Sequence, residues 1–266
     1  MTGEPVALSA LLWSPLVLLI PAAVIGLYRV RLMRDALFAV VRMGVQLVFV
    51  GFYLGFVFSY NRPWLTLLWT ALIIAVAAQT ALKRTKFSWR EMGAPLCVSL
   101  LVGMVIPLVF ILWLVARELP FVTAATTIPF CGLILGHCMK NIIIALRTLK
   151  GDVQEREREI RYAIALGATP REALQDSVRR AMTDALAPHI ATMAAAGLVV
   201  LPGMMTGVLI GGASPVAAVE YQWLLLTAIF AAKSISIALA LELAIRGASR
   251  RGRRRNYGII RVDEIR

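Results

Sequence analysis

The chain has 266 residues, of which 59% are hydrophobic and only 16% are charged. An ordinary soluble domain carries about 25% charged and about 45–50% apolar residues, so this composition excludes that class. The formal net charge of +13 does not indicate a nucleic-acid partner, because the basic residues lie between apolar runs instead of forming one surface of a soluble fold. We therefore expect an all-α integral membrane protein.

Seven apolar stretches are candidates for membrane-spanning helices, since about 20 apolar residues cross a bilayer core. In chain order they lie near residues 8–28, 36–59, 64–82, 94–115, 122–146, 190–212 and 222–245. A polar segment, 147–189, separates the fifth and sixth stretches, and a basic tail, 246–266, follows the seventh. We expect one transmembrane domain over residues 1–266.

Basic residues predict the orientation of these helices. Connection 29–35 holds three basic residues, connection 83–92 holds four, and the polar segment and the tail hold eight each. The alternate connections hold only Arg62 and Arg117. Because basic residues stay on the cytoplasmic side, we expect the N-terminus outside, the C-terminus in the cytoplasm, and a multi-pass protein of the cell membrane (the inner membrane where there are two).

The second stretch carries polar residues near its cytoplasmic end. Arg42 and Gln46 are four residues apart and therefore share one face of a helix. A long arginine side chain can extend from this depth to the membrane surface, which is a purely structural role. Alternatively, Arg42 and Gln46 line a substrate pathway and help to close its inner end.

The fifth stretch contains residue types that bind transition metals. Cys131 and Cys138 are seven residues apart and lie on roughly one helix face, whereas His137 points about 100° away. These residues do not form a metal site within one helix, and packing is the simpler interpretation. His137 and Cys138 remain candidate metal ligands in a pathway.

The polar segment is predicted to be a helical hairpin. A charged helix over 152–166 ends at Gly167, because glycine is the usual residue just past a helix end. Thr169 then suits the N-cap of a second helix, with Pro170 at its first position and Glu172 completing a capping box. The second helix has an apolar face at helical spacing, made by Leu174, Val178, Ala181, Met182, Ala185 and Leu186.

Two interpretations of this cytoplasmic hairpin remain open. A sharp turn between two helices, displayed in the cytoplasm, suits docking to a partner protein. The same hairpin also suits a connector that rests on the membrane surface. The mechanics of the hairpin alone favour neither.

A proline interrupts the sixth stretch. Pro202 cannot donate a backbone hydrogen bond, so the helix is expected to be kinked or loosened within the membrane. Gly203, Met204 and Met205 follow directly. A broken helix with soft thioethers suits a pause point for a substrate, and Met204 and Met205 are candidate metal ligands there. A packing kink with methionines as filler is the alternative.

The seventh stretch contains Lys233 near its middle, where a charge is costly and usually functional. No acidic residue lies at comparable depth, because Glu242 is nine residues away and better placed to pair with Arg246. Three interpretations remain open. Lys233 is neutral through burial, or it donates to backbone carbonyls freed by prolines, or it binds an anionic substrate.

Several short motifs resemble the Fet-type permeases, a family of iron-export ABC permeases related to plant aluminium-tolerance permeases. The resemblance covers nearly the whole chain. The matching motifs are Arg42-x-x-x-Gln46-Leu47, Lys83-Arg84-x-Lys86, Leu166-Gly167-Ala168-Thr169-Pro170, Leu201-Pro202-Gly203-Met204-Met205-Thr206-Gly207 and Tyr221-Gln222. His137 departs from the amide residue of the family, and Lys233 departs from a small or hydroxyl residue.

The resemblance implies a seven-span permease that works as a homodimer with two copies of a separate ATPase, which binds ATP and Mg²⁺. It also implies metal-ion export, with iron as the suggested cargo. The hairpin resembles the coupling loop of ABC permeases, although Arg161 stands where that loop usually has a glutamate. The implied contacts with the ATPase are Ala163, Gly167, Ala168, Thr169 and Pro170.

The sequence has no G-x-x-x-x-G-K-[ST] phosphate-binding loop. We therefore expect a transport subunit that is not itself an enzyme and binds no cofactor, driven by a partner chain. One alternative is an ion-coupled secondary transporter, although the spans hold no central carboxylate to carry the ion. Others are an exporter of an anionic or organic solute, and a membrane scaffold or receptor.

Overall fold

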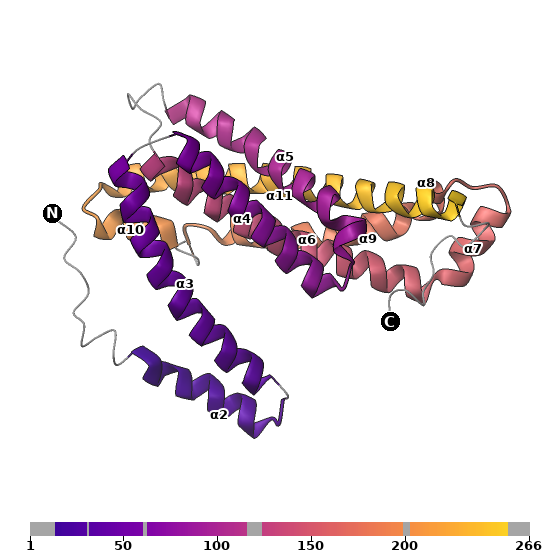
Figure 1. Cartoon of the computed structure of the whole chain (residues 1–266), viewed down its shortest axis with the longest axis horizontal. Coiled ribbons are helices and arrows are strands. Elements are labelled where there is room, and N and C mark those ends of the chain that lie inside the picture. The colour runs from indigo at the N-terminus through magenta and orange to yellow at the C-terminus, as the bar shows by residue number, and fades with distance from the viewer. Residues whose placement is uncertain (1–13, 31, 61–62, 116–123, 199–202, 255–266) are drawn as a thin grey trace. The chain divides into compact units, whose positions relative to one another are not determined.

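The computed structural model describes residues 14–30, 32–60, 63–115, 124–198 and 203–254. Every secondary-structure element within these ranges is a helix, which confirms the predicted all-α class (Figure 1). The chain divides into two units, Met1–Asn61 and Arg62–Arg266, and each is described separately.

The first unit contains one long apolar helix. A 3-10 helix, η1 (Ser14–Leu18), leads into α2 (Leu19–Leu27), and a turn leads to α3 (Met33–Tyr60). Within α3, Met33–Val57 is long and apolar enough to cross a membrane, in agreement with the prediction for 36–59. The helical stretch Leu16–Leu27 is shorter, and the first six residues of the predicted span 8–28 lie outside the described ranges.

The second unit holds the remaining helices of the described chain. They are α4 (Pro63–Thr85), α5 (Trp89–Val115), α6 (Ala124–Glu155), α7 (Glu157–Ala165), α8 (Pro170–Ala173), α9 (Gln175–Ala195), α10 (Gly203–Ile210) and α11 (Pro215–Arg254). In Figure 1, α11 runs alongside α5, and α6 packs against α4, α9 and α11. The largest fully buried side chains of this bundle include Leu96, Leu100, Met104, Ile134, Ile142, Leu146, Ile237 and Leu241.

A glycine brings α5 and α11 into close contact. A Cβ atom placed on Gly103 would lie 2.5 Å from Cβ of Ser236 and 2.9 Å from the carbonyl oxygen of Ala232. Small residues at this crossing let the two backbones approach, as is common between membrane helices. Ala232 and Ser236 face α5, and Lys233 lies about 100° from Ala232 and about 60° from Ser236 around α11, so it is turned away from this crossing.

The number of long apolar helices differs from the predicted number of spans. Among the described residues, five helices are long and apolar enough to cross a membrane, whereas the sequence predicted seven spans. The predicted span 190–212 is not one helix. The α9 helix ends at Ala195, Ala196 is extended with ψ 134°, and Gly197 has φ +87°, so helical hydrogen bonding stops before α10 begins at Gly203.

The predicted boundary of the polar segment at 147 stays a prediction, and it falls within one helix. The α6 helix continues without interruption to Glu155, and its C-terminal part packs against α9. The charged helix predicted over 152–166 is therefore divided at Arg156, whose φ of −101° and ψ of 21° separate α6 from α7. The predicted second helix is divided in the same way at Leu174, between α8 and α9.

The α9 helix runs antiparallel to α6. Ser177 of α9 bonds to Asp152 of α6. Later in α9, the carbonyl of Ala185 accepts a hydrogen bond from Asn141, which comes earlier in α6 than Asp152. His189 lies level with Leu226 in α11, inside the apolar stretch Pro215–Gly247. The predicted cytoplasmic segment 147–189 therefore extends into the helix bundle at its C-terminal end.

Candidate coupling turn and buried polar cluster

The exposed turn, which we define as residues 166–170, has a fixed backbone conformation. Gly167 has φ +99°, a left-handed conformation that glycine adopts without the cost of a side chain. The N–H of Gly167 donates to the carbonyl of Ile164 at 3.0 Å, and the N–H of Ala168 donates to the carbonyl of Ala163 at 3.1 Å. These two bonds close the end of α7 in a Schellman motif, which confirms Gly167 as the predicted helix stop.

A capping box fixes the other side of the turn. Thr169 is the N-cap of α8, and its hydroxyl accepts a hydrogen bond from the N–H of Glu172 at 3.3 Å. The Glu172 carboxylate accepts in return from the N–H of Thr169 at 2.8 Å. These bonds lower the pKa of Glu172 below its ordinary value. The predicted capping box with Pro170 at the first helical position is thus confirmed.

Apolar side chains project from the chain beside the turn. Leu166 is 71% exposed and Tyr162 is 68% exposed, although neither is polar enough to favour water. On the opposite side of the hairpin, Ile160 and Leu174 are buried in the core. The hairpin is therefore anchored by one face, while Leu166 and Gly167 of the turn and Tyr162 of α7 are exposed.

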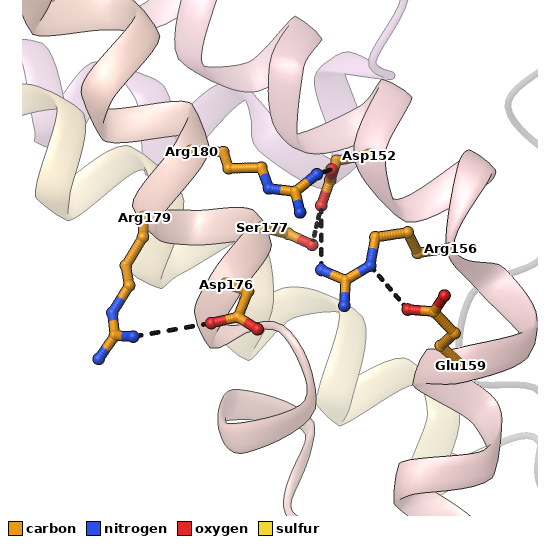
Figure 2. Close-up of polar contacts among 7 residues, drawn as sticks. All are labelled: Asp152, Arg156, Glu159, Asp176, Ser177, Arg179 and Arg180. Atoms are coloured by element: carbon orange, nitrogen blue, oxygen red, sulfur yellow. Dashed lines mark hydrogen bonds and ion pairs between the residues drawn. The ribbon is translucent and has the colours of Figure 1, made fainter.

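A buried carboxylate joins the two helices on either side of the hairpin (Figure 2). Asp152, at the end of α6, accepts hydrogen bonds from the hydroxyl of Ser177 and from Arg180, the latter at 2.8 Å, both in α9. Arg156 lies 4.0 Å from the same carboxylate and is paired with Glu159 at 2.8 Å. We call Asp152, Ser177 and Arg180 the Asp152 clamp. It ties α6 to α9 where the hairpin leaves the bundle.

A second contact joins the hairpin to the last helix. Arg171, directly after the exposed turn, lies 3.6 Å from the carboxylate of Glu242 in α11. Glu242 also binds Arg246 at 2.8 Å, the pairing that the sequence predicted. The exposed turn is therefore connected through the Asp152 clamp to α6 and α9, and through Glu242 to α11.

The C-terminal parts of α4 and α6 are also bonded. The guanidinium of Arg147 donates to the carbonyl of Arg84 through Nε at 3.0 Å and through Nη2 at 2.7 Å. This carbonyl lies at the end of α4, where the backbone has no helical partner for it. Arg147 therefore marks the level at which α4 ends.

Four polar residues from three helices form a cluster, which we call the buried polar cluster: His137 and Asn141 of α6, His189 of α9 and Lys233 of α11. His137 is half-buried, and the other three are buried. The centroids of the His137 and His189 imidazole rings lie 6.4 Å apart. Nε2 of His189 lies 3.3 Å from the carbonyl of Leu226, so this nitrogen donates the bond. The Asn141 amide donates to the carbonyl of Ala185.

Lys233 is 4% exposed, although it carries an ammonium group. It lies close enough to His137 and His189 to act on both electrostatically. Within the described ranges, no carboxylate forms an ion pair with it. The structure thus places two sequence-predicted residues, Lys233 and His137, in one location.

Two of the candidate metal ligands, His137 and Cys138, have different neighbours. His137 lies beside His189, whereas the thiol of Cys138 contacts the hydroxyl of Ser236. In the part of the chain that the structure describes, no group of three or more His, Cys, Asp or Glu residues is arranged to hold a metal ion. Gly203 and Met205 belong to α10, while Pro202 and the side chain of Met204 lie outside the described part.

The two polar residues of the second stretch belong to the first unit. Arg42 and Gln46 are both exposed and lie on α3. Their predicted role in a pathway stays a prediction.

Sequence reasoning missed the partners that complete both sites. His189 and Asn141 are isolated polar residues beside apolar runs, and this pattern was the available signal. Asp152 and Ser177 lie 25 positions apart, and only the antiparallel pairing of α6 with α9 brings them together.

The long apolar helices and the many large apolar side chains exposed on them define a multi-pass membrane protein. A family model described as "Uncharacterised protein family (UPF0014)" matches residues 8–248. The chain belongs to this family, which agrees with the resemblance to Fet-type permeases.

Three relatives show how far the similarity extends. The UPF0014 membrane protein YjkA of Bacillus subtilis is 32% identical over 76% of this chain and 80% of its own length. The UPF0014 membrane protein STAR2 of Oryza sativa is 34% identical, over 81% and 74% respectively. The probable iron export permease protein FetB of Escherichia coli is 31% identical, over 82% and 83%. No solved structure matches the chain.

Proposed function

We propose that this chain is the membrane-spanning subunit of an ABC transporter, driven by a separate ATPase that binds the exposed turn. The observation that carries the proposal is the turn itself. Its backbone is fixed on both sides by the Schellman motif and the capping box, while Leu166 and Tyr162 remain exposed. Exposed apolar side chains on a rigid element are typical of a docking surface.

The contacts behind the turn suit the transmission of movement. A displacement of the turn acts on α6 and α9 through the Asp152 clamp. It acts on α11 through Arg171 and Glu242. These three helices also enclose the buried polar cluster, so the force reaches the helices that would hold a solute.

The remaining features of the proposal follow from the sequence and from the relatives. Two copies of the chain pair in the membrane, the N-terminus lies outside, and the segments near 8–28 and 190–212 complete seven spans. Transport is outward. Iron is the cargo suggested by the printed name of the Escherichia coli relative alone.

The docking role is tested with Leu166→Glu. Leu166 is exposed and supports no core contact, so the substitution should leave the fold intact. The tagged chain is purified gently from its native membranes, and ATP hydrolysis of the purified complex is measured. Because the chain has no P-loop, hydrolysis reports a bound ATPase. We expect at least a tenfold loss of hydrolysis with Leu166→Glu.

Gln154→Glu is the matched control, because it adds the same charge at an exposed position at the end of α6, away from the turn. It should retain hydrolysis. The proposal is wrong if Leu166→Glu keeps full hydrolysis, or if vesicles that contain only this chain transport solute at the full rate.

A further inference from the structure

The structure assigns to the buried polar cluster the binding of an anionic solute, whose carboxylate or phosphate oxygens accept hydrogen bonds from Lys233 and His137. This inference rests on the proposed transport function and names the chemical class of the cargo. The cluster is formed by α6, α9 and α11, which are also the helices connected to the exposed turn.

Lys233 carries a positive charge, and only 4% of its surface is exposed. A buried lysine without a partner of opposite charge is costly. The described residues supply no carboxylate to Lys233, and Glu242, the nearest acidic residue along α11, is nine residues away and already binds Arg171 and Arg246. The charge is therefore free to bind a ligand of opposite sign.

The neighbours of Lys233 add positive charge to the cluster. The titratable groups near Lys233 are His137, Cys138, Lys140 and His189. Lys140 is a second cation beside Lys233, and two positive charges repel a metal cation and attract an anion. In contrast to Asn141 and His189, which bond to backbone carbonyls, His137 has no hydrogen-bond partner in the described part of the chain. Its ring remains available to a ligand.

The depth of the cluster in the membrane follows from its position along α6. Ten residues separate His137 from Arg147, which marks the inner end of α4, and ten helical residues span about 15 Å. A bilayer core is about 30 Å thick, so the cluster lies near its middle. Solute sites of transporters occur at this depth, between helices that move relative to one another.

The test measures binding of citrate and inorganic phosphate to the purified full chain in discs of uncharged phospholipid, by titration calorimetry. Wild type should bind at least one of the two probes saturably. Lys233→Met, which keeps the length of the side chain and removes its charge, should weaken binding at least tenfold, or about 1.4 kcal/mol. Lys233→Arg should retain binding within about threefold, because it keeps the charge.

Lys83→Met is the matched control, since Lys83 is an exposed lysine in the last turn of α4 and does not belong to the cluster. It should change the affinity less than threefold. The inference is overturned if wild type binds neither probe, if both lysine-to-methionine variants weaken binding equally, or if only an anionic lipid headgroup added to the discs binds at Lys233. Saturable Fe²⁺ binding that Lys233→Met strengthens would also overturn it.

Different results would contradict anion binding at the cluster and ATPase docking at the turn. Lys233→Met leaves the exposed turn unchanged, so ATPase association should persist in this variant. If association persists and anions do not bind, the cargo class is wrong while the transport role stands. If Leu166→Glu has no effect on hydrolysis, the docking role is wrong whatever the cluster binds.

Discussion

Replacement of Asp152 by asparagine should loosen the hairpin from the bundle. The Asp152 side chain is 7% exposed and accepts bonds from Ser177, which is buried, and from Arg180, which is 58% exposed. A hydrogen bond to a charged group contributes about 1.5–3 kcal/mol. The Arg180 bond is discounted because water screens it.

The expected cost is therefore about 2 kcal/mol, carried mainly by the buried Ser177 bond, which corresponds to roughly a 30-fold increase in local opening. Hydrogen exchange of the amides in α7 and at the start of α9 measures this opening in the full chain. Ser177→Ala should cause a similar loss. The double variant should cost little more than either single change, because both act on the same bond: asparagine removes the charge of its acceptor, and alanine removes its donor.

Asp176→Asn is the control. Asp176 is 63% exposed and pairs with Arg179 at 3.7 Å, so its loss should change local opening by less than about 0.5 kcal/mol. Equal exchange rates in Asp152→Asn and Asp176→Asn would refute the clamp. So would additive effects of Asp152→Asn and Ser177→Ala.

Four further predictions concern the contacts around the turn and the bundle. Glu242→Gln should change the free energy of unfolding by less than about 1 kcal/mol, since the arginines that Glu242 binds are largely exposed. It should lower transport while ATPase association persists. Transport at the wild-type rate would argue against a link from the turn to α11 through Glu242. Thr169→Ala should cost about 1 kcal/mol of local stability, seen as faster proteolysis at the turn. The pKa of Glu172 is lowered from 4.5, so its contribution to the local stability of the turn is present above that value. This contribution is lost as the pH falls through the lower folded-state pKa, so Glu172→Gln should flatten the dependence of local stability on pH. Gly103→Val should destabilise the chain by about 1–3 kcal/mol in thermal unfolding, because the added atoms meet Ser236, and Ser236→Gly should restore part of the loss.

Local signals in the sequence predicted the turn better than the lengths of the helices. Gly167, Thr169 and Glu172 act through bonds to residues at most five positions away, so their roles are encoded nearby. The extension of α6 to Glu155 depends instead on packing against α9. Charged residues at the inner end of α6 looked like the start of a separate helix, because the partner surface is distant in the sequence.

The polar cluster was predicted only in part for the same reason. Lys233 stood out because a charge in the middle of an apolar run is rare. His189 did not, since it lies in a segment assigned to the cytoplasm, and only the depth reached by α9 places it beside Leu226. Contacts across helices follow from topology, and a single sequence does not contain the pairing of its helices in explicit form.

The unbroken length of α11 has a mechanical consequence. Its 40 residues extend about 60 Å, twice the thickness of a bilayer core. The tight crossing with Gly103 lies near the midpoint of α11 and leaves little room for the helix to slide. A tilt of α11 about this crossing therefore moves its two ends in opposite directions. Distance probes attached near Val216 and Arg246 would report such opposed displacements during the ATP cycle, and parallel displacements would rule out a tilt of α11 about Gly103.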